Sequence, residues 1–189
     1  MRVMLVDDHP ERLALLDTAL TAAGHEVAAR VSPRDDLLAA VQRHAPDIVL
    51  IDVDAPSRDT LESLGQIKRD RPRPVVLFAA HSDQDTIRKA LQAGVSAYVV
   101  DGLSPSRIQS VIDVAIARFA EFQALQAELD ETRLKLADRR DVEKAKGILM
   151  QRRGLDEPAA YALLRRMAMD RNLRIGDASR AVLAAADLL

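Results

Sequence analysis

Two helices and the turn between them are encoded in residues 141–170, DVEKAKGILMQRRGLDEPAAYALLRRMAMD. Gly154 follows a pair of arginines and suits the left-handed conformation in which many helices end. Asp156 is a favourable N-cap for a second helix, and Pro158 suits its first turn. The stretch therefore predicts a helix that ends just before Gly154, a tight turn, and a second helix that begins just after Asp156.

Apolar and basic residues alternate through this stretch at helical spacing. The apolar positions are Val142, Ala145, Leu149, Ala160, Leu163, Leu164 and Met167. The basic residues fall between them, so we expect their side chains to point into solvent, where they can contact a polyanion. A solvated charged face without a ligand is the alternative. Gly147 costs about 1 kcal/mol relative to Ala inside an exposed helix, which indicates either a packing constraint or close approach by another backbone or a ligand.

These residues resemble a known family. The run AKGILM at 145–150, Gly154, Ala160-Tyr161, Leu164-Arg165 and Ala168-Met169 are similar to the ANTAR domain, an RNA-binding output module of transcription antiterminators, over residues 130–189. RNA is recognised mainly through accessible single-stranded loops, because duplex RNA hides its base edges. We expect RNA contacts from Lys144, Lys146, Gly147, Arg152, Arg153, Tyr161, Arg165 and Arg166.

The charge of the chain is unevenly distributed. Residues 1–132 contain 14 Lys and Arg against 21 Asp and Glu, a balance of −7, and residues 133–189 contain 13 against 8, a balance of +5, which together give the net charge of −2. An acidic first part and a basic tail indicate that only the tail meets a polyanion. The low aromatic content argues against extended base-stacking platforms.

The composition excludes several classes of protein. The hydrophobic content of 48% supports a core, and the absence of cysteine excludes a disulfide framework and thiolate metal sites, as is typical of the cytoplasm. No apolar run approaches the roughly 18 residues of a membrane span, and the N-terminus MRVMLVDD is typical of a strand rather than a signal peptide. We find no nucleophile–His–acid grouping and no Gly-rich phosphate loop, so we expect a protein that is not an enzyme.

Residues 1–118 alternate expected strands and helices with short connections. The strands are expected at Val3–Val6, Glu26–Val31, Ile48–Ile51, Val75–Phe78 and Ala97–Val100. The helices are expected at Pro10–Ala23, Pro33–His44, Thr60–Arg69 and Asp83–Ala93, with a further one from Pro105. Continuous apolar strands are typical of a parallel sheet buried on both faces. We therefore predict an α/β doubly wound, flavodoxin-like domain, with its site beyond the carboxyl ends of the strands.

Acidic residues occur at those strand ends. Asp7 and Asp8 follow the first strand and Asp52 follows the third. Clustered carboxylates raise one another's pKa, and an oxygen-liganded ion such as Mg²⁺ would relieve the repulsion; three merely solvated acids are the alternative. With Asp54, Asp59 and the segment from Gly94 to Val100, residues 1–118 resemble a response-regulator receiver domain. The resemblance implies that Asp52 is the phospho-acceptor and that Asp7, Asp8 and Asp52 bind the metal.

Two positions depart from the receiver pattern. Ala79 stands where receivers place a Thr or Ser, and Asp101 stands where they place a Lys. Each change removes a charge-assisted hydrogen bond to a phosphoryl group, worth roughly 1.5–3 kcal/mol. We therefore expect a pseudo-receiver in which Asp52 is not the main switch; a retained phospho-switch with unusual geometry is the alternative.

A long helix is expected to join the two domains over residues 105–140. Ala115, Phe122, Leu129 and Leu136 recur every seven residues, with Leu125 between them. The other interleaved positions are polar, at Arg118, Thr132 and Arg139. This pattern predicts a short coiled coil and a parallel homodimer, and the alternative is a helix packed on its own domain. A third helix, within residues 173–189, is expected to complete a small three-helix bundle.

The whole arrangement resembles the nitrate-assimilation antiterminators of the NasT type. The resemblance lies in YVVDGL at 98–103, DVAIARF at 113–119 and the tail at 151–172. It implies binding to paired hairpins of a leader RNA, which prevents a terminator hairpin from forming. It also implies control by a nitrate- or nitrite-sensing inhibitor protein (NasS-type). The alternatives are a phosphorylation-activated regulator, a DNA-binding transcription factor, and a module that binds an acidic protein.

Overall fold

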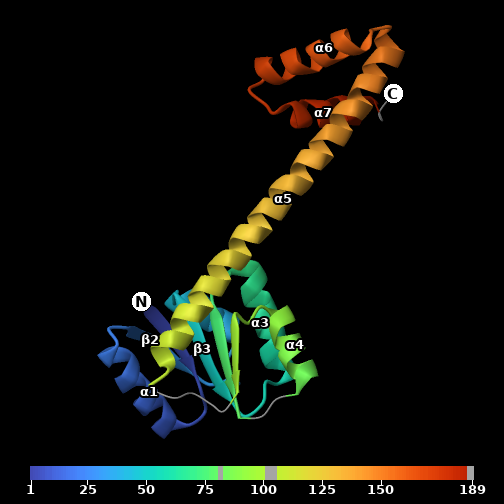
Figure 1. Ribbon diagram of the computed structural model, residues 1–189. Helices are drawn as coiled ribbons and strands as arrows, with labels where there is room; N and C mark the ends of the chain where they lie inside the picture. The colour runs from blue at the N-terminus through green and yellow to red at the C-terminus, as the bar shows by residue number, and fades with distance from the viewer. Residues whose placement is uncertain (81–82, 101–105, 187–189) are drawn as a thin grey trace. The chain divides into compact units, whose positions relative to one another are not determined.

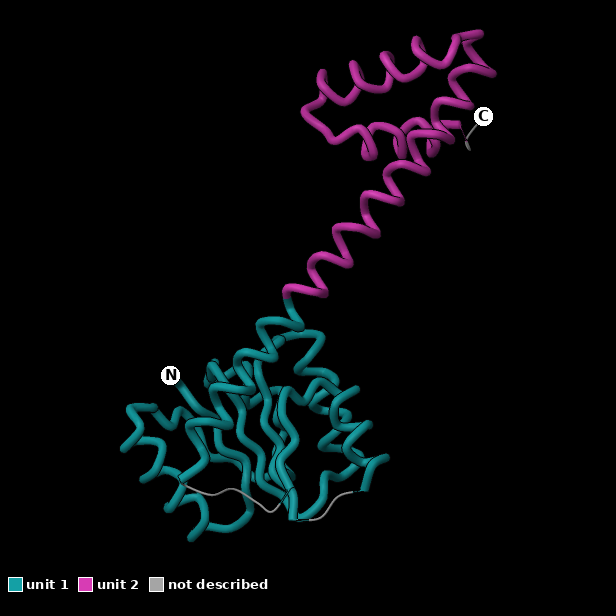
Figure 2. Tube along the Cα trace, in the orientation of Figure 1, with its two compact units in different colours: residues 1–123 teal, residues 124–189 magenta. Residues whose placement is uncertain are grey.

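The computed structural model describes residues 1–80, 83–100 and 106–186. The chain divides into two compact units, Met1–Gln123 and Ala124–Leu189 (Figure 2). Among the described residues, no helix is long and apolar enough to cross a membrane.

The first unit is a five-stranded parallel sheet flanked by helices (Figure 1). The elements follow in the order β1 (Arg2–Val6), α1 (Pro10–Ala22), β2 (Glu26–Val31), α2 (Leu37–His44), β3 (Ile48–Val53), α3 (Arg58–Asp70), β4 (Val75–Ala79), α4 (Gln84–Ala93) and β5 (Ala97–Val100). The strand order is β2-β1-β3-β4-β5, and all neighbouring strands are parallel. The chain adds β2 on one side of β1 and then β3, β4 and β5 on the other side. The predicted doubly wound fold is confirmed, with the topological switch point at the ends of β1 and β3, where ligands bind in such sheets.

The sheet is buried on both faces, and each face has its own core. Met4 and Val6 point to the face covered by α2, α3 and α4, where Val41 and Leu64 meet them. Val3 and Leu5 point to the other face. The helical residues that pack there are Leu16 and Leu20 of α1 and Ile108, Ile112 and Ala115 of the last helix of the unit. This alternation follows from the two-residue period of a strand, and it places the carboxyl ends of β1 and β3 side by side.

Helix α2 begins later than the sequence suggested. The helix expected from Pro33 starts at Leu37, because the side chain of Asp36 caps it by accepting the backbone N–H of Ala39 at 2.9 Å. The residues before it form a turn in which the carboxylate of Asp35 accepts the N–H of Ser32 at 2.7 Å. Side-chain capping of this kind competes with helix continuation.

A single helix, α5, runs from Ile108 to Arg153; the expected start at Pro105 lies outside the described residues. Its first turns pack against the sheet, and Ala115 is fully buried there. At Ala115, the helix therefore packs on its own domain, which was the alternative to the predicted coiled coil. The seam of apolar residues is exposed only beyond that point. Its members and their exposed fractions are Phe122 44%, Leu125 57%, Leu129 41% and Leu136 55%.

The second unit contains the end of α5 together with α6 (Glu157–Asp170) and α7 (Ile175–Ala186). Gly154 has a φ of +64°, and Asp156 caps α6 through the N–H of Ala159 at 2.9 Å, both as predicted. The core joins Ala145 of α5 to Leu164 of α6. The predicted three-helix bundle is confirmed, with α7 as its third helix.

Candidate RNA-binding surface and acidic pocket

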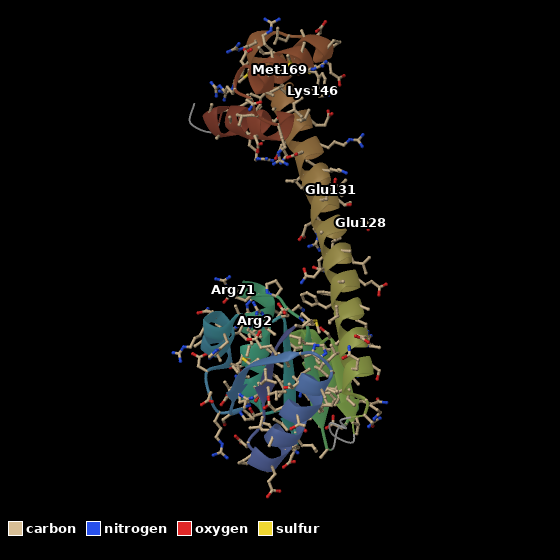
Figure 3. All side chains as sticks on the ribbon, turned by 90° about the vertical axis from the view of Figure 1, so that its left-hand side faces the viewer. Arg2, Arg71, Glu128, Glu131, Lys146 and Met169 are labelled. Atoms are coloured by element: carbon tan, nitrogen blue, oxygen red, sulfur yellow. The ribbon has the colours of Figure 1, made fainter. Side chains whose placement is uncertain are left out.

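The exposed face of α6 combines aromatic, basic and apolar side chains. Tyr161, Arg165 and Met169 follow one another at intervals of four residues, which places them on one face of the helix. Tyr161 is 46% exposed and Met169 is 69% exposed. The opposite face of α6 is buried in the core through Leu164. Figure 3 shows Met169 on this helix, and the residues predicted from sequence did not include it.

Two adjacent arginines of α6 are available to a ligand. Arg165 and Arg166 are adjacent and exposed. In the part of the chain that the structure describes, neither forms an ion pair with a carboxylate, whereas Arg174 and Arg180 of the same unit are both paired with Asp138. Guanidinium groups without an internal partner retain their full capacity to donate hydrogen bonds to phosphate oxygens.

The end of α5 adds further exposed positive charge. Lys144, Arg152 and Arg153 are exposed, and Arg152 donates from Nη2 to the backbone oxygen of Ala186 at 3.0 Å. Gly147 is exposed, and a Cβ placed on it would have no atom within 4 Å. No neighbour in the described structure therefore requires a glycine there, which favours approach by an external backbone or ligand over a packing constraint.

Lys146 is buried, so the expectation that its side chain points into solvent is wrong. The residue is 8% exposed, and its Nζ lies 2.9 Å from Oε2 of Glu143 and 2.6 Å from Oε1 of Glu157. Glu157 stands in the first turn of α6, so Lys146 joins α5 to α6. The hydrogen bonds to Glu157 and Glu143 raise the pKa of Lys146, and the bond to Lys146 lowers the pKa of Glu157.

A second ionic cluster joins α7 to α5, and sequence reasoning missed it. Arg180 Nη1 lies 2.7 Å from Asp138 and 3.1 Å from Asp141, and its Nη2 lies 2.5 Å from Asp177. The hydrogen bond to Asp138 is the main cause of a raised pKa for Arg180. Gly176 lies against the same cluster: a Cβ at this position would overlap the carboxylate of Asp138, so the close packing requires a glycine. The spacing of Asp177 and Arg180 is the only sequence signal that could have indicated part of this cluster.

At the carboxyl ends of β1 and β3, an arginine lies between the buried acids. Asp7 is 3% exposed and Asp52 is 5% exposed. Nε of Arg12 lies 2.5 Å from Oδ2 of Asp7 and 3.3 Å from Oδ2 of Asp52, and its Nη2 donates to Oδ1 of Asp7 at 2.7 Å. The hydrogen bond to Asp7 and the charge of Asp52 raise the pKa of Arg12. The sequence analysis did not anticipate this residue in the pocket.

Two further positions of the receiver pattern are Asp8, which follows β1, and Ala79, which ends β4. Asp8 accepts a hydrogen bond from the hydroxyl of Ser32 at 2.5 Å and lies 3.8 Å from Nε of Arg34. Ala79 is fully buried at the end of β4, beside Val53 in the sheet register, and brings no hydroxyl group. Asp101 lies outside the described residues. The pocket at this edge has a volume of about 640 Å³.

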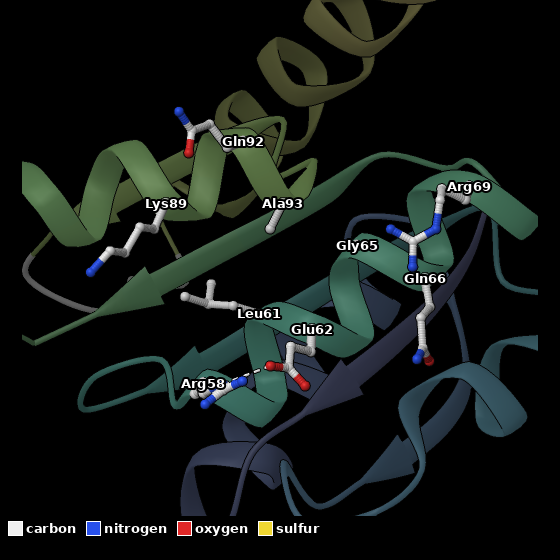
Figure 4. Close-up of a pocket in the computed structure, with 9 residues that line it drawn as sticks. All are labelled: Arg58, Leu61, Glu62, Gly65, Gln66, Arg69, Lys89, Gln92 and Ala93. Carbon is white, nitrogen blue, oxygen red and sulfur yellow. Dashed lines mark hydrogen bonds and ion pairs between the residues drawn. The ribbon is translucent and has the colours of Figure 1, made fainter.

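A separate groove lies between α3 and α4, with a volume of about 540 Å³. Figure 4 shows Arg58 paired with Glu62 along α3, at 2.7 Å. Lys89 on the other wall is paired with Asp85 of its own helix at 2.6 Å. Arg58 and Lys89 are therefore already paired with acids of their own helices, and a ligand would have to compete with these acids for both cations.

The fold and the pocket define the response-regulator class, and comparison with known proteins agrees. The receiver-domain family model matches residues 3–113, and the ANTAR-domain model matches residues 130–183. The chain belongs to the response regulators, and it carries an ANTAR output domain. It is 33% identical over 184 residues to the transcriptional regulatory protein PdtaR of Mycobacterium tuberculosis (strain ATCC 25618 / H37Rv), which covers 96% of this chain and 89% of that protein.

Another relative and two solved structures cover smaller shares of the chain. The transcriptional regulatory protein KdpE of Mycobacterium tuberculosis (strain ATCC 25618 / H37Rv) is 25% identical over 92% of this chain and 75% of that protein. A LuxR-family two-component response regulator from Aurantimonas sp. SI85-9A1 is 28% identical with a TM-score of 0.53, over 61% of this chain and 84% of that chain. A CheY-like receiver domain from Methanospirillum hungatei JF-1 is similar in fold alone, at 21% identity and a TM-score of 0.55 over 64% of this chain and 96% of that chain.

Receiver domains typically bind Mg²⁺ at an acidic pocket, and the acids of this pocket do not fit such an ion. Both oxygens of Asp7 accept hydrogen bonds from Arg12, and Asp8 is engaged by Ser32. Across residues 1–80, 83–100 and 106–186, no group of three or more His, Cys, Asp or Glu side chains is arranged to hold a metal ion. The predicted grouping of Asp7, Asp8 and Asp52 around a cation is therefore not formed.

Proposed function

We propose that this protein is a cytoplasmic transcription antitermination regulator, whose ANTAR domain binds tandem hairpins in a leader RNA. The observation that supports this most directly is a pair of exposed arginines of α6, Arg165 and Arg166, which form no ion pair among the described residues and lie near Tyr161 on the same helix. Arginine contacts position a protein on the phosphates, and an aromatic ring can lie against an unpaired loop base. The charge of +5 over residues 133–189 favours a polyanionic ligand.

A homodimer would present two such surfaces to two hairpins. The exposed seam of α5, from Phe122 to Leu136, supports a parallel coiled coil. Two output domains on one dimer bind a double hairpin with an advantage in effective concentration that a single hairpin cannot provide. Holding the double hairpin keeps an overlapping terminator from forming, so that transcription continues.

Control of the regulator is proposed to come mainly from a sensor partner protein that sequesters it. The buried contact of Asp52 with Arg12 and the alanine at position 79 support this, because the predicted phospho-acceptor already faces a cation and Ala79 brings no hydroxyl group to bind a phosphoryl oxygen. From the sequence resemblance, we propose a nitrate- or nitrite-sensing protein of the NasS type as this partner and nitrate-assimilation genes as the target. Activation by phosphorylation of Asp52 is the second candidate.

A binding assay with three nucleic acids tests the proposal. The full chain is titrated with a double-hairpin RNA, the same RNA with one hairpin deleted, and a duplex DNA. We expect the double hairpin to bind most tightly and the affinity to fall steeply with salt. Equal or tighter binding to duplex DNA would instead favour a DNA-binding transcription factor, and no binding to any of the three would favour a module for an acidic protein.

Matched variants locate the surface. Arg165→Ala with Arg166→Ala removes two charges from α6, and Arg133→Ala with Lys135→Ala removes two from α5, where they pair with Asp130 and Glu131. We expect the first double variant to weaken binding to the double hairpin by about tenfold or more and to lower the salt slope by about two. The second double variant should bind like the wild type; an equal loss in both would mean that the charge acts without a defined surface.

A further inference from the structure

We propose that Arg12 is a built-in cation of the acidic pocket, that it takes the place held by a divalent metal ion in receiver domains, and that this pocket is therefore closed to Mg²⁺. Arg12 and the acids around it all lie in the first unit, so this role of Arg12 is independent of what the ANTAR domain binds.

Both oxygens of Asp7 are engaged by protein donors, which occupy three of its roughly four acceptor sites. Its Oδ2 accepts Nε of Arg12, and its Oδ1 accepts both Nη2 of Arg12 at 2.7 Å and the backbone N–H of His9 at 2.8 Å. A planar guanidinium that meets both oxygens of one carboxylate is among the strongest side-chain pairings in proteins. A metal ion could coordinate Asp7 only by displacing these bonds.

The same guanidinium also serves the second buried acid. Nε of Arg12 lies 3.3 Å from Oδ2 of Asp52. Two carboxylates buried at 3% and 5% exposure would repel each other strongly without a cation. With the positive charge of Arg12 beside them, the two carboxylates and the guanidinium together carry a net charge of −1. Their mutual repulsion is thereby reduced, and the attraction of the pocket for a divalent cation is weaker.

The position of Arg12 in the chain shows that the pocket holds it there. The residue lies in the first turn of α1 (Pro10–Ala22). The positive end of the helix dipole disfavours a basic side chain at that end and favours acidic ones. Two carboxylates outweigh this effect, and Arg12 is turned toward them with 31% of its side chain exposed.

The third acid of the expected metal site is held elsewhere. Asp8 accepts the hydroxyl of Ser32 at 2.5 Å and faces Arg34 at 3.8 Å. Hard divalent ions require several oxygen ligands converging at about 2.0–2.6 Å. Both oxygens of Asp7 are bonded to Arg12, Asp52 lies beside the same cation and Asp8 is bonded to Ser32, so the three acids do not converge as a metal site among the described residues.

Magnesium titration of the full chain tests the proposal. Thermal unfolding and isothermal calorimetry are followed as Mg²⁺ is added to the wild type, to Arg12→Ala, and to Arg30→Ala. Arg30 is the matched control, because it forms an arginine–aspartate pair with Asp17 outside the pocket, at 2.5 Å. We expect no saturable Mg²⁺ site in the wild type or in Arg30→Ala.

The Arg12→Ala variant should gain a site. We expect one saturable Mg²⁺ per chain and a rise in its melting temperature on adding Mg²⁺, both abolished in Arg12→Ala with Asp52→Asn. Arg12→Ala without added metal should melt below the wild type, because two buried acids are left without a cation. A folded Arg12→Ala that gains no site would overturn the proposal.

The wild-type titration decides the question even where Arg12→Ala does not fold. One saturable Mg²⁺ site in the wild type, with a rise in melting temperature, would show that Arg12 yields its place to the ion and would overturn the proposal. Arg12→Gln, which keeps a hydrogen-bond donor but removes the charge, then serves as the second variant and is expected to gain Mg²⁺ binding.

Discussion

Nζ of Lys146 on α5 lies 2.6 Å from Oε1 of Glu157 in the first turn of α6. This contact joins the two helices that present the proposed RNA-binding side chains. Glu143, one turn before Lys146 on α5, completes the set at 2.9 Å. The buried lysine therefore sets how α5 and α6 meet, in addition to any contribution of its charge to the surface.

Replacing Lys146 by Met should lower the melting temperature of the second unit and weaken RNA binding. The substitution leaves Glu157 and Glu143 without their shared partner, and α6 loses its ionic link to α5. Lys135→Met is the control, because Lys135 forms an exposed ion pair with Glu131 within α5. Thermal unfolding and RNA titration measure both effects. A variant that lost RNA binding with no change in melting temperature would indicate a direct contact of Lys146 with RNA instead.

The same ion pair predicts a dependence on pH. The pKa of Glu157 is lowered by Lys146, so its contribution to stability is present above the unfolded pKa and is lost as pH falls through the folded pKa. The melting temperature should therefore fall on acidification more in the wild type than in Glu157→Gln. Melting curves between neutral pH and the acid range measure this difference. Identical pH profiles for the two proteins would show that the pair contributes nothing.

Replacing Gly147 by Ala should stabilise the protein and weaken RNA binding. Alanine is favoured over glycine in a helix by about 1 kcal/mol, and a Cβ at this position meets no atom within 4 Å. Loss of affinity would follow from the methyl group blocking close approach by RNA. The control is Gly65→Ala in α3, where a Cβ would make an ordinary contact with Arg69 at 3.6 Å. Chemical denaturation and RNA titration test both parts, and unchanged affinity would remove Gly147 from the surface.

Replacing Leu129 by Glu should convert the proposed dimer to a monomer. The substitution places a charge without a partner in an apolar seam. Leu134→Glu is a matched control, because Leu134 is similarly exposed, at 40% against 41%, but falls outside the heptad positions. Sedimentation or light scattering gives the oligomeric state. A wild type that remains monomeric at high concentration, or equal effects of the two variants, would contradict the coiled coil.

Replacing Asp52 by Asn should leave the response to signal largely intact. Asp52 is buried beside Arg12, and Ala79 provides no hydroxyl to recognise a phosphoryl group. A terminator-readthrough reporter in cells measures the response, with Asp54→Asn as the control, because Asp54 is an exposed acid just after β3. Complete loss of the response in Asp52→Asn alone would establish phosphorylation as the main switch.

Local signals in the sequence predicted the fold well. Apolar strands gave the sheet, and Gly154 and Asp156 gave the turn between α5 and α6, because each acts on its immediate neighbours. The ionic contacts were not predictable in this way. Lys146 forms an ion pair with a glutamate on another helix, Glu157. Arg12 lies beside Asp52, a strand residue 40 positions further along the chain. Side chains that look free in one helix acquire partners only when the elements pack.

The first turns of α5 form part of the receiver's own core, since Ile108, Ile112 and Ala115 cover one face of its sheet. This has a consequence for building chimaeras with other regulators. An exchange joined ahead of Ile108 would remove the part of that cover that α5 supplies beside Leu16 and Leu20 of α1, and it would exchange core packing as well as output. A junction placed beyond Ala115 keeps the donor's sheet sealed, so only there can output modules be interchanged without rebuilding the domain they report on.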